Sequence, residues 1–356
     1  MIYPCRYGMI NAVWNSGHRQ NGSWTRRCED GKMKEIKEIL VTVPVNSRQK
    51  AFLEQQAEGG NYDCRFHYCG FGSVTADVIR PVHYLIGGCE KQVLREAENL
   101  QWIQIMFAGL DYFIDPAVVP EQVLITNAAG AYGLTVGEHM IGMTFALVRR
   151  FPEYAYQQHK GPLWAPVGNV TSVEGSTVLV LGMGDIGSFY ARKMKALGSY
   201  VIGVRRTLRA LPEGFDEQHT LEELDSLLGR ADIVASVLPG IPETQGLFGA
   251  KQFSEMKDGA YFINAGRGTA VDTEALREAL KSGKIGGAAL DVTDPEPLPL
   301  TDELWTMKNV MITPHVAGNL YLAETTERIL RIAGENLRRM THGETVVRSI
   351  DRKMGY

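Results

Sequence analysis

Short apolar runs alternate with stretches of helical periodicity along most of this chain. The first series predicts strands at 39–43, 62–68, 82–86, 102–106 and 123–126, with helices at 49–57 and 92–99. Strands that alternate with helices in this way form a mostly parallel sheet covered by helices. The first third of the sequence therefore predicts an α/β layer.

A second series of apolar runs predicts six further strands, at 178–181, 200–204, 233–237, 261–264, 287–290 and 310–313. Ahead of it lies a helix pattern at 135–150, whose apolar positions cover more than one face and so indicate burial between domains or subunits. Pro152 is expected to end that helix, and residues 157–175 are expected to form a loop. A last helix pattern, 319–341, is expected to return to the first layer.

Residues 1–32 follow neither a helical nor a strand period. We interpret them as a poorly ordered extension. The fold is expected to begin near Met33.

Composition narrows the class of protein. With 356 residues, of which 44% are hydrophobic and 22% charged, the chain is long enough for two ordinary globular domains. A net charge of −4 leaves no basic footprint for nucleic acid or a membrane surface. The five cysteines include no C-x-x-C pair and are odd in number, so neither a disulfide framework nor a metal site is expected. Without a membrane-length apolar run or a signal-peptide pattern, a cytoplasmic location is expected.

The most informative stretch follows the apolar run 178–181. It spells G-x-G-x-x-G with Gly182, Met183, Gly184, Asp185, Ile186 and Gly187. An amphipathic segment and a second strand come next, which is the context in which this motif indicates dinucleotide binding. Gly182 is expected to make the tight turn, Gly184 to let a pyrophosphate approach the backbone, and Gly187 to let helix and strand pack closely. The start of the helix then offers N–H groups to the phosphate.

Polar residues gather directly after the strands of the second series. Arg267 follows the fourth strand, Asp291 and Glu296 follow the fifth, and His315 follows the sixth. Because ligands of doubly wound sheets lie outside the carboxyl ends of the strands, we expect these side chains at one edge. An arginine, a carboxylate and a histidine together supply an anion clamp, an orienting group and a titratable acid/base.

In this order the motifs resemble those of the D-isomer-specific 2-hydroxyacid dehydrogenases. The resemblance covers about residues 35–345. It rests on the Gly-rich loop, Asn264-Ala-Gly-Arg-Gly268, Ala289-Leu-Asp-Val-Thr-Asp-Pro-Glu-Pro297, Thr313-Pro-His-Val-Ala-Gly318, Phe107-Ala-Gly-Leu-Asp111 and Val136-Gly-Glu-His139.

The resemblance implies an α/β fold of two Rossmann-like or flavodoxin-like doubly wound parallel-sheet domains, with the coenzyme domain inserted in the catalytic domain. The substrate (catalytic) domain is expected at 33–127 and 316–356, and the NAD(P)-binding Rossmann domain at 128–315. The resemblance also implies a homodimer, formed through the helix that begins near Val136. His139 and Trp164 are expected to be packing residues.

The resemblance also implies roles for individual residues. Arg267 would clamp the substrate carboxylate and polarise the ketone oxygen, His315 would exchange a proton with that oxygen, and Glu296 would fix the tautomer of His315. Backbone N–H groups near Ala108 and Gly109 would hold the carboxylate, and Asp291 would meet the nicotinamide amide. Further coenzyme contacts are expected at Leu238, Pro239, Thr244, Ala265, Gly266, His315 and Gly318.

The end of the 200–204 strand bears on the choice of coenzyme. NAD-preferring folds carry an acid there to bond the ribose 2′-hydroxyl, whereas this chain has Arg205, Arg206 and Thr207. Two guanidinium groups and a hydroxyl attract a 2′-phosphate. NADP(H) is therefore favoured, with NAD(H) as the alternative.

The leading hypothesis is NAD(P)H-dependent reduction of a small 2-oxo acid to a D-2-hydroxy acid, and the reverse reaction. Glyoxylate or hydroxypyruvate is one candidate substrate, and a bulkier branched or aromatic keto acid is another. A formate- or phosphite-type dehydrogenase is an alternative, and Glu296 counts against the formate enzymes because they carry Gln in its place. A third alternative is a non-catalytic, dinucleotide-sensing, corepressor-like protein, which turnover and partner binding would distinguish.

Overall fold

The computed structural model describes residues 34–318 and 320–352. The predicted extension 1–32 and the predicted start of the last helix at residue 319 lie outside the described residues. The chain forms two compact units, each described by itself below. The second unit runs from Ala129 to Arg328, and the first contains the residues on either side of it.

One boundary differs from the domain limits expected above. Residues 316–328, assigned there to the substrate domain, make their contacts within the second unit. The division falls inside helix α10 (Ala323–His342), which is continuous across it. A helix carries no break in hydrophobic periodicity at such a point, so the sequence contains no signal for this boundary.

The first unit contains a five-stranded parallel sheet with the strand order β2-β1-β3-β4-β5. This is the flavodoxin-like order, in which ligands bind where neighbouring strands diverge. The strands are β1 (Ile36–Val41), β2 (Asp63–Tyr68), β3 (Tyr84–Gly87), β4 (Trp102–Ile105) and β5 (Leu124–Thr126). The helices other than α10 are α1 (Ser47–Gln56), η1 (Phe71–Ser73), α2 (Ala76–Ile79), α3 (Lys91–Leu94) and η2 (Asp111–Ile114).

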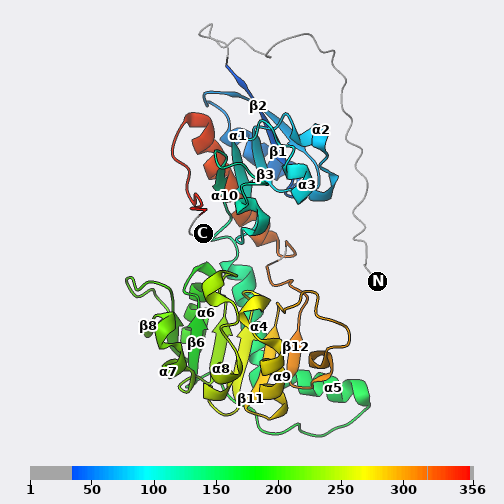
Figure 1. Cartoon of the computed structure of the whole chain (residues 1–356), viewed down its shortest axis with the longest axis vertical. Helices are drawn as coiled ribbons and strands as arrows, with labels where there is room; N and C mark the ends of the chain where they lie inside the picture. The colour runs from blue at the N-terminus through cyan, green and yellow to red at the C-terminus, as the bar shows by residue number, and fades with distance from the viewer. Residues whose placement is uncertain (1–33, 319, 353–356) are drawn as a thin grey trace. The chain divides into compact units, whose positions relative to one another are not determined.

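The last helix returns to this sheet, as predicted. Figure 1 shows α10, in red, beside the strands of the first unit. Asn336 on α10 donates a hydrogen bond of 2.8 Å to Gln104 Oε1 on β4, and Thr126 Oγ1 donates to the same oxygen at 2.8 Å. All three residues are buried. A buried polar network whose members are paired favours one arrangement of helix against sheet.

The second unit contains a seven-stranded parallel sheet in the order β12-β11-β10-β9-β6-β7-β8. The chain leaves β6 in one direction to β7 and β8, then crosses to β9 and continues to β12. The strands are β6 (Thr177–Leu181), β7 (Tyr200–Val204), β8 (Glu217–His219), β9 (Ile233–Ser236), β10 (Ala260–Asn264), β11 (Ile285–Leu290) and β12 (Val310–Ile312). The change of direction between β6 and β9 is the switch point at which such sheets bind ligands.

The helices of the second unit pack on an apolar core. They are α4 (Gly133–Val148), α5 (Phe151–Lys160), α6 (Asp185–Ala196), η3 (Leu221–Glu223), α7 (Leu224–Leu228), η4 (Pro242–Thr244), α8 (Ala250–Glu255), η5 (Gly268–Ala270), α9 (Thr273–Lys281) and η6 (Glu303–Thr306). Phe248, Phe253 and Phe262 are fully buried in this core, with ring centroids 4.8–5.9 Å apart. Each buried side chain of this size contributes about 1.5–3 kcal/mol to folding. The prediction of two parallel-sheet α/β domains is confirmed.

Several local predictions were wrong. Residues 157–160 belong to α5 rather than to a loop, because Pro152 occupies its first turn, where the missing N–H has no partner to lose. The strand β8 consists of three polar residues and carries no apolar signal. The helix expected at 92–99 extends only over Lys91–Leu94. Trp164 is fully exposed rather than packed.

Part of the apolar surface of α4 is buried against α6, in the same unit. Gly137 lies so close to Phe189 on α6 that an added Cβ would come 2.3 Å from the ring. Two turns further along α4, the hydroxyl oxygens of Thr144 and Tyr190 lie 2.8 Å apart, and both residues are buried. Glycine at the crossing point thus lets α4 and α6 approach closely.

Candidate active site

The Gly-rich loop joins β6 to α6 at the switch point. Gly182 has a φ of +103° and donates its N–H to Val204 O at 2.9 Å. At Gly187 an added Cβ would lie 1.8 Å from Gly182 O, whereas at Gly184 nothing lies within 4 Å. The tight turn and the close helix packing are therefore present as predicted. The open space at Gly184, beside the start of α6, fits a pyrophosphate that approaches the backbone.

The two glycines give a matched pair of substitutions. Gly187→Ala is expected to destabilise the second unit by about 2 kcal/mol or more, because the new Cβ overlaps backbone that cannot move freely. Gly184→Ala is expected to leave the Tm nearly unchanged and to weaken NADPH binding about tenfold, because the methyl group fills the space of the phosphate. Thermal melts and fluorescence titration with NADPH measure the two effects. Equal losses of Tm in both variants would contradict this assignment.

The other residues of the loop have partners within the second unit. Met183 is buried, and its sulfur would lie 2.5 Å from a Cβ added at Gly203 on β7. Ile186 is half-buried. The Asp185 carboxylate accepts the N–H of Gly133, at the start of α4, at 2.6 Å. Asp185 thus stabilises the N-terminus of α4, where a negative charge is favourable.

The residues proposed to bind a 2′-phosphate directly follow β7. Arg206 and Thr207 are exposed, and Arg205 is half-buried and donates its N–H to His219 O at 3.0 Å. Among the described residues no carboxylate forms an ion pair with Arg205. Its guanidinium group is therefore available to an anion.

The nearest carboxylate on the neighbouring strand β8 is already paired. Arg230 and His219 both hydrogen-bond to Glu217, and their contacts lower the pKa of Glu217 to about 2. The same carboxylate and Glu223 raise the pKa of His219. The Glu217 carboxylate is thus held by Arg230 and His219.

Two loops, after β9 and after β10, touch each other through their backbones. An added Cβ at Gly266 would lie 2.6 Å from Leu238 O, so only glycine fits this approach. Pro239 is exposed and Ala265 half-buried. Thr244 is buried, and its hydroxyl donates to Pro239 O at 2.6 Å. The Thr244 hydroxyl therefore stabilises the turn after β9.

Arg267 stands on the loop after β10. Its Nη1 donates to Gly266 O at 2.9 Å, and its aliphatic part lies against Gly240. The buried side chain of Asn264 holds the loop, since it donates to Arg267 O at 3.0 Å and accepts from the Gly266 N–H at 3.1 Å. Among the described residues no carboxylate pairs with Arg267. An arginine held in this way can bind an incoming carboxylate through its planar fork.

His315 follows β12 and lies beside the end of β11. Its backbone is left-handed, with a φ of +51°, and its N–H donates to Asp291 O at 2.8 Å. Its Nδ1 lies 2.6 Å from Glu296 Oε1. Both side chains are partly exposed, 45% for His315 and 43% for Glu296. Since an ionised carboxylate only accepts, the proton of the neutral imidazole sits on Nδ1, and Nε2 is left to face a reactant.

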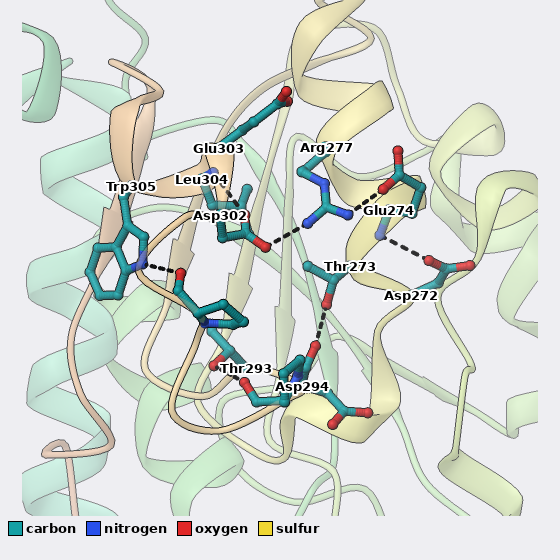
Figure 2. A network of polar contacts seen from close by, with 12 residues as sticks. Asp272, Thr273, Glu274, Arg277, Thr293, Asp294, Asp302, Glu303, Leu304 and Trp305 are labelled. Carbon is teal, nitrogen blue, oxygen red and sulfur yellow. Dashed lines mark hydrogen bonds and ion pairs between the residues drawn. The ribbon is translucent and has the colours of Figure 1, made fainter.

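The loop that carries Glu296 is anchored to α9, as Figure 2 shows. Thr273 Oγ1 donates to Asp294 O at 2.8 Å, and Arg277 Nη1 donates to Asp302 Oδ2 at 2.6 Å. Arg277 also pairs with Glu274 on its own helix. The side chains of Leu298 and Leu304 are buried in the core of the second unit. These contacts hold the loop on both sides of Glu296.

Asp291 is almost fully buried, at 2% exposure. Its Oδ1 accepts from Thr313 Oγ1 at 2.6 Å and from the Val316 N–H at 2.9 Å. Its Oδ2 accepts from the Ala317 N–H at 3.0 Å. Asp291 thus braces the loop around His315. Gly318, at the end of that loop, lies against Tyr132 and Val136 of the α4 region.

The second loop expected to bind substrate lies in the first unit. Ala108 is exposed and Gly109 half-buried, after β4. Asn127 Nδ2 donates to Ala108 O at 3.0 Å, and the Ala128 N–H donates to Phe107 O at 3.1 Å. Both bonds are accepted by carbonyl oxygens and fix the loop. They do not involve the N–H groups of Ala108 and Gly109. Met106 is buried and Phe107 exposed.

Sequence reasoning missed three residues that hold the site together: Asn264, Thr313 and His139. His139 was expected only to pack, whereas its Nε2 lies 3.0 Å from Thr313 Oγ1. Asn264, buried at the end of β10, and Thr313, half-buried directly after β12, lie inside motifs that were recognised. A polar residue at the end of an apolar strand is the signal that marks both. His139 carries no such signal, because its partner is 174 residues away in the chain.

Comparisons with known proteins identify the family of this chain. Residues 141–317 match the family model described as D-isomer specific 2-hydroxyacid dehydrogenase, NAD binding domain. The glyoxylate/hydroxypyruvate reductase B of Escherichia fergusonii is 34% identical over 261 residues, which cover 71% of this chain and 79% of the relative.

Two solved structures share the fold. A D-isomer specific 2-hydroxyacid dehydrogenase from Xanthobacter autotrophicus Py2, in complex with NADPH and MES, has a TM-score of 0.74 and 32% identity and covers 90% of this chain and 99% of its own. An NADPH-dependent glyoxylate/hydroxypyruvate reductase from Sinorhizobium meliloti, in complex with NADP and sulfate, has a TM-score of 0.73 and 26% identity and covers 90% and 100%.

No helix in the part of the chain that the structure describes is long and apolar enough to cross a membrane. The motifs, the two parallel sheets and the relatives lead to one assignment. The chain belongs to the D-isomer-specific 2-hydroxyacid dehydrogenase family, and it is an oxidoreductase that acts on CH–OH groups with NAD(P).

Proposed function

We propose that this protein reduces a small 2-oxo acid to the D-2-hydroxy acid with NADPH, and that His315 supplies the proton. The observation that carries the proposal is the His315–Glu296 pair, with Nδ1 and Oε1 2.6 Å apart. The pair lies on the loops after β12 and β11. Arg267, which pairs with no carboxylate of the described residues, lies on the loop after the next strand, β10. A proton donor and an anion clamp on adjacent strand ends suit the reduction of a carbonyl beside a carboxylate.

Each of these residues has its own role in the proposed reaction. When bound at the Gly-rich loop, the reduced nicotinamide supplies the hydride to the carbonyl carbon. Arg267 binds the carboxylate and stabilises the negative charge that develops on the ketone oxygen. His315 Nε2 delivers a proton to that oxygen, and Glu296, at Nδ1, stabilises the cationic imidazolium form from which the proton comes. In the reverse direction His315 accepts the proton.

The coenzyme preference is proposed to come from Arg205 and Arg206. Replacing both by alanine is expected to raise the KM for NADPH about 10- to 100-fold, since each charge-assisted hydrogen bond contributes about 1.5–3 kcal/mol. The KM for NADH is expected to change by less than about threefold, because NADH has no 2′-phosphate. Steady-state kinetics with both coenzymes measure the ratio. Arg149→Ala, an exposed arginine beyond α4, is the control for general charge effects.

The proposed assembly is a homodimer. Five large apolar side chains are exposed on α5 and the loop after it: Phe151, Tyr154, Tyr156, Leu163 and Trp164. Figure 1 shows this segment extending from the second unit. Several large apolar side chains exposed on one segment favour an interaction surface there. Light scattering is expected to give the mass of a dimer at micromolar concentration, and Trp164→Ser is expected to shift it toward monomer.

The reaction itself is tested with a panel of substrates. Coenzyme oxidation is followed with glyoxylate, hydroxypyruvate, pyruvate and bulkier 2-oxo acids, each with NADPH and NADH. We expect faster turnover with NADPH and one preferred acid. Binding of NADPH without turnover of any acid would overturn the proposal in favour of a dinucleotide sensor, and oxidation of formate or phosphite would overturn it in favour of that class.

A further inference from the structure

Helix α4 contacts the loop of His315 along one face. Thr135 Oγ1 donates to Ala317 O at 3.3 Å, and one turn later His139 Nε2 lies 3.0 Å from Thr313 Oγ1. Residues four apart lie on the same side of a helix, so both contacts come from one stripe of α4. The loop between Thr313 and Ala317 is therefore held from the helix side as well as from the sheet.

The direction of these hydrogen bonds follows from their chemistry. The Asp291 carboxylate only accepts, so the Thr313 hydroxyl must give its single proton to Asp291 Oδ1, 2.6 Å away. The Thr313 oxygen can then only accept from His139. His139 must therefore carry a proton on Nε2, and the bonds run in one sense, from His139 to Thr313 to Asp291.

The other end of this series is the backbone beside His315. Asp291 accepts the N–H groups of Val316 and Ala317 with its two oxygens, at 2.9 and 3.0 Å. The backbone of His315 itself is left-handed, which costs a non-glycine residue about 1–2 kcal/mol. Such a conformation persists only when neighbouring residues stabilise it. Here the Asp291 carboxylate stabilises it through its hydrogen bonds to the next two residues.

We propose that His139 is a positioning residue, which orients the catalytic His315 through the series His139–Thr313–Asp291. This inference rests on the proposed role of His315. His139 has no hydrogen bond to the His315 ring among the described residues, so its effect reaches the ring only through the loop. A shift of about 1 Å in the proton donor costs up to about 100-fold in rate, whereas the coenzyme loop after β6 keeps its geometry.

The test uses His139→Leu, His139→Gln, Thr313→Val and the double variant His139→Leu/Thr313→Val. We expect His139→Leu and Thr313→Val each to lower kcat about 10-fold or more, with KM for NADPH within about twofold of the parent enzyme. Gln can still donate to Thr313, so His139→Gln is expected to keep kcat within about threefold. Because the two residues act in series, the double variant is expected to be no slower than the slower single variant.

Tyr190→Phe is the matched control, because it removes the buried hydrogen bond to Thr144 on the same helix and leaves the series intact. It is expected to keep the parent kcat. If Tyr190→Phe lowers kcat as much as His139→Leu, or if the losses of the single variants multiply, His139 acts only through the packing of α4 and the inference fails.

Hydrogen exchange separates this inference from the proposed function, because it needs no turnover. In His139→Leu and Thr313→Val the amides of Val316 and Ala317 are expected to exchange at least about 10-fold faster, while those of β6 keep their protection. Unchanged exchange at Val316 and Ala317 would overturn the inference even if the enzyme reduces 2-oxo acids. If the variants exchange faster but the parent protein turns over no 2-oxo acid, the role of His139 in holding the loop stands and the proposed reaction is refuted.

Discussion

Arg267→Ala is expected to lower kcat/KM for the preferred 2-oxo acid by about 10³-fold or more, which corresponds to about 4 kcal/mol of transition-state stabilisation. The loss is expected to be large because, in the proposed reaction, the fork binds the carboxylate and also stabilises the oxygen on which charge develops. The free energy of unfolding is expected to change by less than about 1 kcal/mol. Within the described residues, the Arg267 side chain hydrogen-bonds only to Gly266 O, and the loop itself is held by Asn264.

Two further variants sharpen this prediction. Arg267→Lys keeps the charge but offers no planar fork, so it is expected to recover only part of the lost rate. Arg149→Ala removes an exposed arginine of the same unit and is expected to behave like the parent enzyme. Parental kcat/KM in Arg267→Ala, with NADPH bound normally, would exclude Arg267 from the substrate site.

His315→Asn is expected to lower kcat by about 10²- to 10⁴-fold, the usual contribution of a positioned acid/base. Asparagine is the suitable replacement because it tolerates the left-handed backbone at this position, where φ is +51°. It cannot exchange a proton near neutral pH. Substrate binding is expected to persist, since Arg267 remains. Steady-state and single-turnover kinetics separate the loss of chemistry from a loss of binding.

The partner of His315 is expected to show a smaller effect. Glu296→Gln keeps a hydrogen-bond acceptor at Nδ1 but removes the charge that stabilises the protonated imidazole, so kcat is expected to fall less than in His315→Asn. His159→Ala removes an exposed histidine on α5 and serves as the control. A His315→Asn enzyme with the parental rate would show that the proton comes from another group.

The sequence alone was sufficient for the parts of this protein that depend on local patterns. Buried parallel strands appear as apolar runs, so all eleven predicted strands coincide with observed ones at most of their predicted residues, as at Tyr200–Val204. The Gly-rich loop was recognised from its place between a strand and a helix, and Gly182 and Gly187 meet steric requirements that other residues fail. Arg267, Glu296 and His315 follow successive strands in the sequence. Their position at one edge of the sheet then followed from the rule that ligands bind at the carboxyl ends of parallel strands.

Local patterns did not predict elements that are formed by polar or exposed residues. The strand β8 consists of Glu217, Gln218 and His219, which pair with β7 through the backbone and leave no apolar run. Residues 157–160, the last turn of α5, were predicted as a loop because none of them is apolar. Both elements exist because neighbouring segments satisfy their backbone or stabilise their ends, and a single sequence window does not contain those neighbours.

The arrangement around His315 is of the second kind. His139, Asp291 and Thr313 come from α4 and from the ends of β11 and β12, far apart in the chain. Hydrogen bonds among such residues have no period and no spacing, and they form only when folding brings three elements together. Residue types and their order thus led to the proposed chemistry, whereas the contacts that hold the loop of His315 in place followed only from how helix and sheet pack in three dimensions.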